Sequence, residues 1–194
     1  MSKKNSKQIV IDANLAYASG NLKFNPVIGP AGAIAADRNR QCLQAIFDEG
    51  HIDVFGRRLY EEWTRHSAEG SYAQDWFKLM MRQSRIERED GSSFAALADP
   101  ACACLSADGE KAALAKDFHL IQSALATGQL ILSNEIRFPK YVALASQAVP
   151  ELASLHYANP GIEGEQCRLW IKAGAEKEPD RRIDLWVGNH LKSN

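Results

Sequence analysis

The sequence predicts an α/β protein in which helices cover both faces of a central parallel sheet. Short apolar runs rich in β-branched residues alternate along the chain with longer segments of helical periodicity. Two of these runs end on acids, Asp12 after Ile-Val-Ile and Glu135 shortly after Leu-Ile-Leu. The length of 194 residues suits one compact domain. Together these observations favour a doubly wound sheet with polar side chains at its carboxyl edge.

The first half of the chain contains two predicted strands and three predicted helices. In order they are a strand at 8–12, a loop holding Asn25-Pro26 and Gly29-Pro30, a helix at about 33–49, a strand at 51–55, and helices at 57–67 and 72–82. Gly50 closes the first long helix. Trp76, Leu79 and Met80 fall on one side of the helix at 72–82, which indicates that this side is packed.

The second half is less regular at first and then resumes the alternation. Residues 85–107 give no clear pattern beyond a helical turn at 94–97. Asp108 and Asp117 are each expected to cap a helix. The predicted elements from there are helices at 108–116 and 117–127, a strand at 129–133, a helix after Pro139, a strand near 152–157, a helix around 163–173, and a polar tail holding Ile183, Leu185 and Trp186.

Composition narrows the class of protein. The formal net charge of -1 argues against a protein that coats nucleic acid through bulk electrostatics, although local binding stays open. Apolar runs are too short to span a bilayer, and the basic start of the chain does not read as a signal peptide. We therefore expect a cytoplasmic protein. The four cysteines have no metal-finger spacing, so reduced structural thiols are expected.

Four acids are the candidate functional residues: Asp12, Glu62, Asp117 and Glu135. Each alone reads more readily as a structural acid, a cap or a solvated loop residue. Two of them, however, follow strands, and Asp117 begins a face that must pack near the strand ends. On the helix at 57–67, Glu62 flanks the apolar stripe, whereas Glu61 points to solvent. Glu62 is therefore preferred.

Convergence of four carboxylates would require a counter-charge. Two carboxylates about 4 Å apart repel by about 4 kcal/mol at an effective dielectric of about 20. Such a cluster must protonate or bind a cation. Oxygen ligands without nitrogen or sulfur favour Mg²⁺ or Mn²⁺. Metal-bound water is suited to phosphodiester hydrolysis, so the expected class is a metal-dependent hydrolase.

The segments around these acids resemble the PIN domain nuclease family. Ile9-Val10-Ile11-Asp12-Ala13-Asn14 is similar to its opening strand, Leu59 to Trp63 to its second-acid helix, Lys116 to Leu125 to its third-acid segment, and Leu130 to Glu135 to its closing strand. The resemblance covers roughly residues 8–160. It implies a Rossmann-like PIN fold over 1–160, with 161–194 as a C-terminal helical extension packed on the same domain.

The resemblance also implies a function, an endoribonuclease that depends on Mg²⁺ or Mn²⁺ and acts on RNA. Many bacterial members are toxins paired with an antitoxin protein; this sequence shows no such partner, and it leaves a homodimer open. Two positions depart from the family pattern. Ala13 stands where a hydroxyl residue is usual, and Glu135 where an Asp is usual. Both departures bear on metal affinity and rate more than on fold.

Specific roles follow as hypotheses. Asp12 and Asp117 would bind the metal directly, and Glu62 and Glu135 directly or through water. Asn14 and Ser133 would orient the carboxylates or a phosphate oxygen. The basic residues expected to grip the substrate backbone are Arg38, Arg40, Arg65 and His66. His119 and the tryptophans Trp63 and Trp76 read better as packed residues than as substrate contacts.

Three rival functions were weighed. A phosphatase of the haloacid-dehalogenase type needs a second Asp where Asn14 stands, and a nucleotide-binding Rossmann module needs a glycine-rich turn after the first strand. Neither requirement is met. The third rival, a PIN-like module that binds RNA or a protein with little catalysis, remains compatible with Ala13 and Glu135.

Overall fold

The computed structural model describes residues 6–20, 30–67 and 69–191. Five strands form one parallel sheet in the order β3-β2-β1-β4-β5. The strands are β1 (Gln8–Ile11), β2 (Ile52–Phe55), β3 (Ile86–Arg88), β4 (Leu130–Leu132) and β5 (His156–Ala158). The predicted α/β class with an all-parallel sheet is therefore confirmed. This strand order is shared by many Rossmann-like proteins and does not single out one family.

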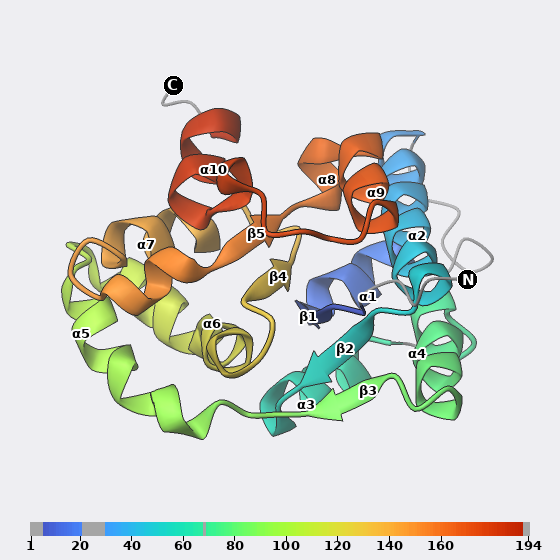
Figure 1. Ribbon diagram of the computed structural model, residues 1–194, viewed down its shortest axis with the longest axis horizontal. Helices are drawn as coiled ribbons and strands as arrows, with labels where there is room; N and C mark the ends of the chain where they lie inside the picture. Colours follow the sequence, from blue (N-terminus) through green and yellow to red (C-terminus); the bar gives the residue numbers. More distant parts are fainter. Residues whose placement is uncertain (1–5, 21–29, 68, 192–194) are drawn as a thin grey trace.

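Helices cover both faces of the sheet (Figure 1). On one side lie α1 (Ala13–Ser19), α2 (Pro30–Glu49), α4 (Tyr72–Arg82), α8 (Pro160–Glu163) and α9 (Glu165–Lys172). On the other lie η1 (Ser92–Leu97), α5 (Ala98–Ala103), α6 (Asp108–Ala126), α7 (Phe138–Ala145) and α10 (Ile183–His190), with η2 (Pro150–Ser154) and η3 (Pro179–Arg181) flanking β5. The helix α3 (Arg57–His66) contacts α1 and α6, one helix from each layer.

One continuous apolar core connects the layers, and it extends from Ile9 in β1 to Trp186 in α10. The strands β1 and β4 are buried along their length because helices lie on both of their faces. Indole groups join α3 to the sheet and α4 to α2. Trp63 Nε1 donates to Ile11 O at 2.9 Å, and Trp76 Nε1 donates to Leu43 O at 2.7 Å. Both tryptophans are core residues, as predicted.

Three sequence predictions about local structure were wrong. Residues 108–126 form one helix, α6, and Asp117 lies inside it instead of capping a second helix. No proline or mid-helix glycine interrupts this segment, so the acid alone does not end the helix. Residues 85–107, for which only a helical turn at 94–97 was predicted, contain β3, η1 and α5; the predicted turn lies within η1, and β3 and α5 were missed. β3 escaped prediction because it is a three-residue edge strand with two charged positions. The expected polar tail contains α10, with Ile183 and Trp186 buried.

The predicted loop motif Asn25-Pro26 and the glycine of Gly29-Pro30 lie outside the described residues. Among the helices of the described segments, none is long and apolar enough to cross a membrane.

Candidate functional site

The sheet has its topological switch point between β1 and β4. The chain proceeds from β1 outward to β3 and then returns to place β4 on the other side of β1. The two helical layers diverge at such a point, and ligands of open α/β sheets bind beyond the strand ends there. Ile11 is paired with Leu132, so Asp12 and Ser133 are the first residues beyond the two matched strand ends.

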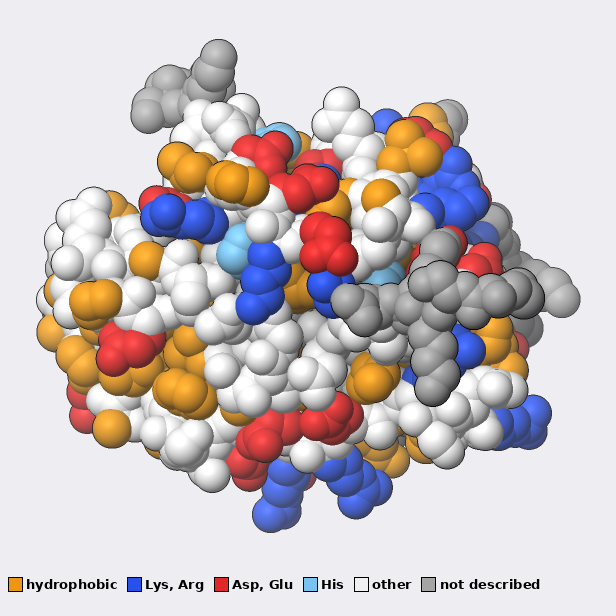
Figure 2. All heavy atoms as spheres, viewed as in Figure 1, with side chains coloured by type: hydrophobic (Ala, Val, Ile, Leu, Met, Phe, Trp, Pro, Cys, Tyr) orange, Lys and Arg blue, Asp and Glu red, His pale blue; other side chains and the backbone are white. Residues whose placement is uncertain are grey.

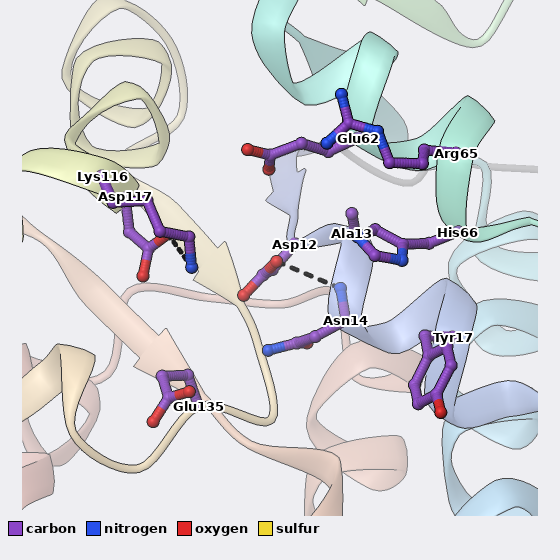
Figure 3. A pocket seen from close by; sticks show the side chains of 10 residues that line it. All are labelled: Asp12, Ala13, Asn14, Tyr17, Glu62, Arg65, His66, Lys116, Asp117 and Glu135. Carbon is purple, nitrogen blue, oxygen red and sulfur yellow. Dashed lines mark hydrogen bonds and ion pairs between the residues drawn. The ribbon is translucent and has the colours of Figure 1, made fainter. Parts of the chain in front are cut away.

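A cavity of about 310 Å³, here called the acidic cavity, opens at this position (Figure 3). All four acids predicted from the sequence line it, together with two of the predicted basic residues. The lining residues are Asp12, Ala13, Asn14, Tyr17, Glu62, Arg65, His66, Lys116, Asp117 and Glu135. The structure thus brings together acids from β1, α3, α6 and the segment after β4, which span more than half of the chain.

Asp12 is held in place by the start of α1 and by the loop after β4. It is the N-cap of α1, and its Oδ1 accepts a hydrogen bond from Asn14 N at 3.1 Å. Its Oδ2 accepts from Ser133 Oγ at 2.6 Å. Burial raises the pKa of Asp12 to about 6; the two hydrogen bonds oppose this shift, and the charges of Asp117 and Glu62 add to it.

The Ser133 hydroxyl connects the loops that follow β1 and β4. It donates to Asp12 and accepts from Asn14 Nδ2 at 3.1 Å and from Glu135 N at 3.0 Å. The hydroxyl therefore uses its single donor and both acceptor lone pairs. Asn14 Oδ1 also accepts from Asn134 N at 3.1 Å. The structure places Asn14 and Ser133 as predicted, beside the carboxylate that they orient.

Glu62 enters the cavity because α3 is fixed by Trp63. The indole hydrogen bond from Trp63 to β1 sets the rotation of α3, and the preceding residue on the helix, Glu62, then faces the strand ends. Glu61, by contrast, points outward and pairs with Arg57 at 3.1 Å. Glu62, the residue preferred from the sequence, lines the cavity, and Glu61 does not.

The Glu62 carboxylate already has two neighbours. Arg58 Nε lies 3.3 Å from one oxygen, and His119 Nε2 lies 3.2 Å from the other. His119 is packed, as expected, but its Nε2 does not meet hydrogen-bond geometry with any described group. Desolvation lowers the pKa of His119. Glu62 is therefore oriented by residues from its own helix and from α6.

Asp117 is accompanied by Lys116, a residue that sequence reasoning missed. Lys116 Nζ lies 3.0 Å from Asp117 Oδ1, and in Figure 3 the amine stands between Asp117 and Asp12. The hydrogen bond to Asp117 raises the pKa of Lys116, and the charges of Glu62 and Asp12 act in the same direction. A basic residue beside a candidate acid on one helix was the signal that could have identified it.

Glu135 lies apart from the other three acids (Figure 3). Its Oε1 accepts hydrogen bonds from Ile136 N and Arg137 N, both at 3.0 Å, so the carboxylate caps its own turn. The Tyr157 hydroxyl on β5 donates to the backbone carbonyls of Ser133 and Glu135 and fixes the course of this loop. A role for Glu135 as a metal ligand stays a prediction.

The basic residues proposed to grip a substrate divide into two pairs. Arg65 and His66 line the acidic cavity. Arg38 and Arg40 lie away from it: Arg38 Nη1 donates to Gly161 O at 3.1 Å, and Arg40 Nε donates to Ser19 O at 2.8 Å. Each of these two arginines reaches a backbone carbonyl of a neighbouring helix, Arg38 in α8 and Arg40 at the last residue of α1, a placement that the sequence does not reveal.

The fit to a divalent cation rests on the donor chemistry. The carboxylates facing one another, Asp12, Glu62 and Asp117, provide the oxygen ligands that Mg²⁺ and Mn²⁺ prefer. Among the described residues, however, no group of three or more Asp, Glu, His or Cys side chains is arranged so that it could hold a metal ion. The donors are thus of the right kind, and Lys116 and Arg58 now balance part of their charge.

Comparison of this chain with protein-family models, with curated proteins and with solved structures found no match. Function is therefore argued from the cavity itself.

Proposed function

We propose that the protein is a metal-dependent phosphodiesterase that hydrolyses RNA, with the acidic cavity as its active site. One observation carries this proposal: acids from four separate elements line one cavity at the switch point of the sheet. Side chains so distant in sequence do not gather for local capping. The raised pKa of Asp12 supports the proposal, because strongly shifted groups in a cleft are typical of functional sites.

A divalent cation is the partner that this electrostatic arrangement favours. Lys116 and Arg58 are substantially exposed, so solvent screens their charges. Mg²⁺ or Mn²⁺ bound here would supply Lewis-acid stabilisation of phosphate charge and a water molecule of lowered pKa. Asp12, Asp117 and Glu62 are the residues that would hold it.

The remaining residues would act on the substrate or on these acids. Ser133 and Asn14 hold the Asp12 carboxylate in one orientation. Arg65 and His66, on the same wall of the cavity, would hold the phosphodiester backbone. Lys116, released from Asp117, would balance charge on a bound phosphate. The resemblance of the four acid segments to PIN nucleases agrees with this division of roles, and a toxin role with an antitoxin partner remains a prediction from that resemblance.

A second candidate, RNA binding with little catalysis, is favoured by a specific observation. Glu62 and Asp117 already have cationic partners, and the described acids do not form a metal-binding group. In that case Lys116, Arg65 and His66 would bind phosphate without hydrolysis.

Cleavage of a mixed single-stranded RNA pool with Mn²⁺ distinguishes the two candidates. We expect cleavage by the wild type and a loss of at least about 100-fold in Asp12→Asn and Asp117→Asn, because each removes a charged ligand. Glu61→Gln is the matched control, since Glu61 lies beside Glu62 but faces solvent. Equal cleavage by all four proteins would identify a contaminant, and Mn²⁺-induced thermal stabilisation that persists in Asp12→Asn would place the metal elsewhere.

A further inference from the structure

A second hollow, here called the aromatic pocket, lies at the carboxyl ends of β2 and β3. Its volume is about 540 Å³, within the usual range for small-ligand sites. Its floor and wall are aromatic. Phe55 packs against Phe77 at 5.0 Å between ring centroids, and Tyr60 lies 5.9 Å from Phe77. Tyr60 is 44% exposed, so its ring is available at the rim.

Charged side chains surround these rings. Arg57 and Arg88 line the pocket and are exposed, and Glu89 and Asp90 line it as well. The two carboxylates are engaged elsewhere, however. Glu89 Oε1 accepts from Gly91 N at 2.7 Å, and Asp90 Oδ1 accepts from Ser92 N at 3.0 Å. One oxygen of each carboxylate is thus bound by a backbone N–H of the next turn. Arg57 pairs with Glu61 at 3.1 Å, so Arg88 is the guanidinium better placed to meet an anion. Figure 2 shows acidic and basic side chains next to one another at the lower edge of the molecule, over α3 and β3.

A groove leads from the aromatic pocket toward the acidic cavity. This connecting groove shares Gly56, Arg57 and Asp90 with the aromatic pocket. Farther along, it is lined by Arg58 and His119, the two residues that contact Glu62 on the wall of the acidic cavity. The three hollows therefore follow one another along α3. A chain with a charge at every unit could extend from one to the next.

The occupant that fits these features is a nucleotide. A flat aromatic base can stack on Tyr60 while Arg57 or Arg88 binds its phosphate. A protein partner fits less well, because a stable interface covers about 800 Å² per partner. Among the residues lining this pocket, the large apolar side chains exposed at the rim are Tyr60 and Met81. That area suits one base.

We propose that the aromatic pocket is a nucleobase subsite for single-stranded RNA whose scissile phosphate lies in the acidic cavity. The inference rests on the proposed function and specifies its substrate: the strand must be single, because a base paired in a duplex cannot insert its face against Tyr60. One nucleotide is bound by stacking, and sequence preference arises from stacking strength.

Binding of a 5′-labelled single-stranded RNA octamer, measured by fluorescence polarisation in EDTA, tests the subsite without cleavage. Tyr60→Leu should weaken binding about 10-fold, in line with the roughly 1–3 kcal/mol that stacking of one base contributes. Tyr60→Phe should bind within about 2-fold of wild type, since it keeps the ring. Arg88→Gln should weaken binding and reduce its salt dependence. Leu144→Ala, on exposed α7, is the control.

The outcomes separate this inference from the proposed function. Wild-type affinity in Tyr60→Leu would overturn the subsite, whatever the affinity of Arg88→Gln and even if Mn²⁺-dependent cleavage is observed. Binding that depends on Tyr60 in EDTA would support the subsite even if no cleavage is found. Binding of duplex RNA as tightly as single-stranded RNA would also overturn it.

Discussion

Glu163 and the acids of the acidic cavity balance their charge in different ways. Glu163, with its side chain 2% exposed, accepts hydrogen bonds from Asn159 N at 2.7 Å, Trp186 Nε1 at 2.8 Å and Arg181 Nη1 at 2.6 Å. Arg181 is itself buried and stacks on Trp170 at 4.3 Å. In the acidic cavity, the acids face one another and their cationic neighbours are exposed. The Glu163 carboxylate is thus paired with a buried cation, whereas the acids of the acidic cavity have room for a ligand.

Asp53 shows a third arrangement, which makes the contrast clearer. It is fully buried in β2, and neither of its carboxyl oxygens meets hydrogen-bond geometry with a described group. Burial raises its pKa well above the ordinary value, because the charged form is desolvated. The comparison teaches that burial alone does not mark a functional acid. The acids of the cavity differ because several of them share one solvent-accessible space.

The largest effect is expected when the buried ion pair between Glu163 and Arg181 is broken. Glu163→Gln leaves the Arg181 guanidinium buried without its counter-charge, so we expect a loss of about 3–5 kcal/mol in the free energy of unfolding. Urea denaturation measures it. The matched control is Glu178→Gln, because Glu178 pairs with the same arginine at 3.4 Å but is half exposed; it should cost less than about 1 kcal/mol. Similar losses in both variants would contradict the distinction.

The second effect is the pH dependence of the free energy of unfolding that Asp12, in the acidic cavity, should produce. The pKa of Asp12 is raised to about 6 in the fold, so its favourable contribution is complete below about pH 4 and is lost as pH rises through 6. Asn is an equally good N-cap. Asp12→Asn should therefore gain stability relative to wild type between pH 4 and 7, by at most about 3 kcal/mol. Urea titrations in EDTA at several pH values measure this gain, and a difference independent of pH would contradict the raised pKa.

The smallest expected effect tests the exposed cation of the cavity. Lys116→Gln should change the free energy of unfolding by less than about 1 kcal/mol, because the Lys116 ammonium group is largely solvated. The same change removes a positive charge that faces three acids, so Mn²⁺ affinity should rise several-fold in titration calorimetry. Lys111→Gln, on the same helix and paired with Asp108 at the surface, is the control. An unchanged or weaker Mn²⁺ affinity in Lys116→Gln would show that Lys116 does not compete for this position.

The sequence was sufficient to predict the class of fold and the four acids that line the acidic cavity, and the reasons can be named. Apolar periodicity is local, so it indicated β1, β4 and the packed side of α3, and with them the places of Asp12 and Glu62. Charge networks are not local. The partners of Glu62 are Arg58 and His119, and the second of these comes from α6, so only the folded chain shows that contact. The side-chain rotamers that bring Lys116 to Asp117 and fold Glu135 back onto its own turn are likewise set only in the folded chain.

The parallel register of β1 and β4 limits the insertions and deletions that this chain can accept during evolution. Gly128, just before β4, lies so close to β1 that a Cβ there would stand 2.1 Å from Gln8 O. Five residues later the same pair of strands delivers Ser133 to Asp12. A one-residue insertion between these points would turn the β4 side chains to the opposite face and remove the hydroxyl. Length changes in descendants of this chain should therefore accumulate in outer loops, while the segment from Gly128 to Ser133 keeps its length whatever residues it exchanges.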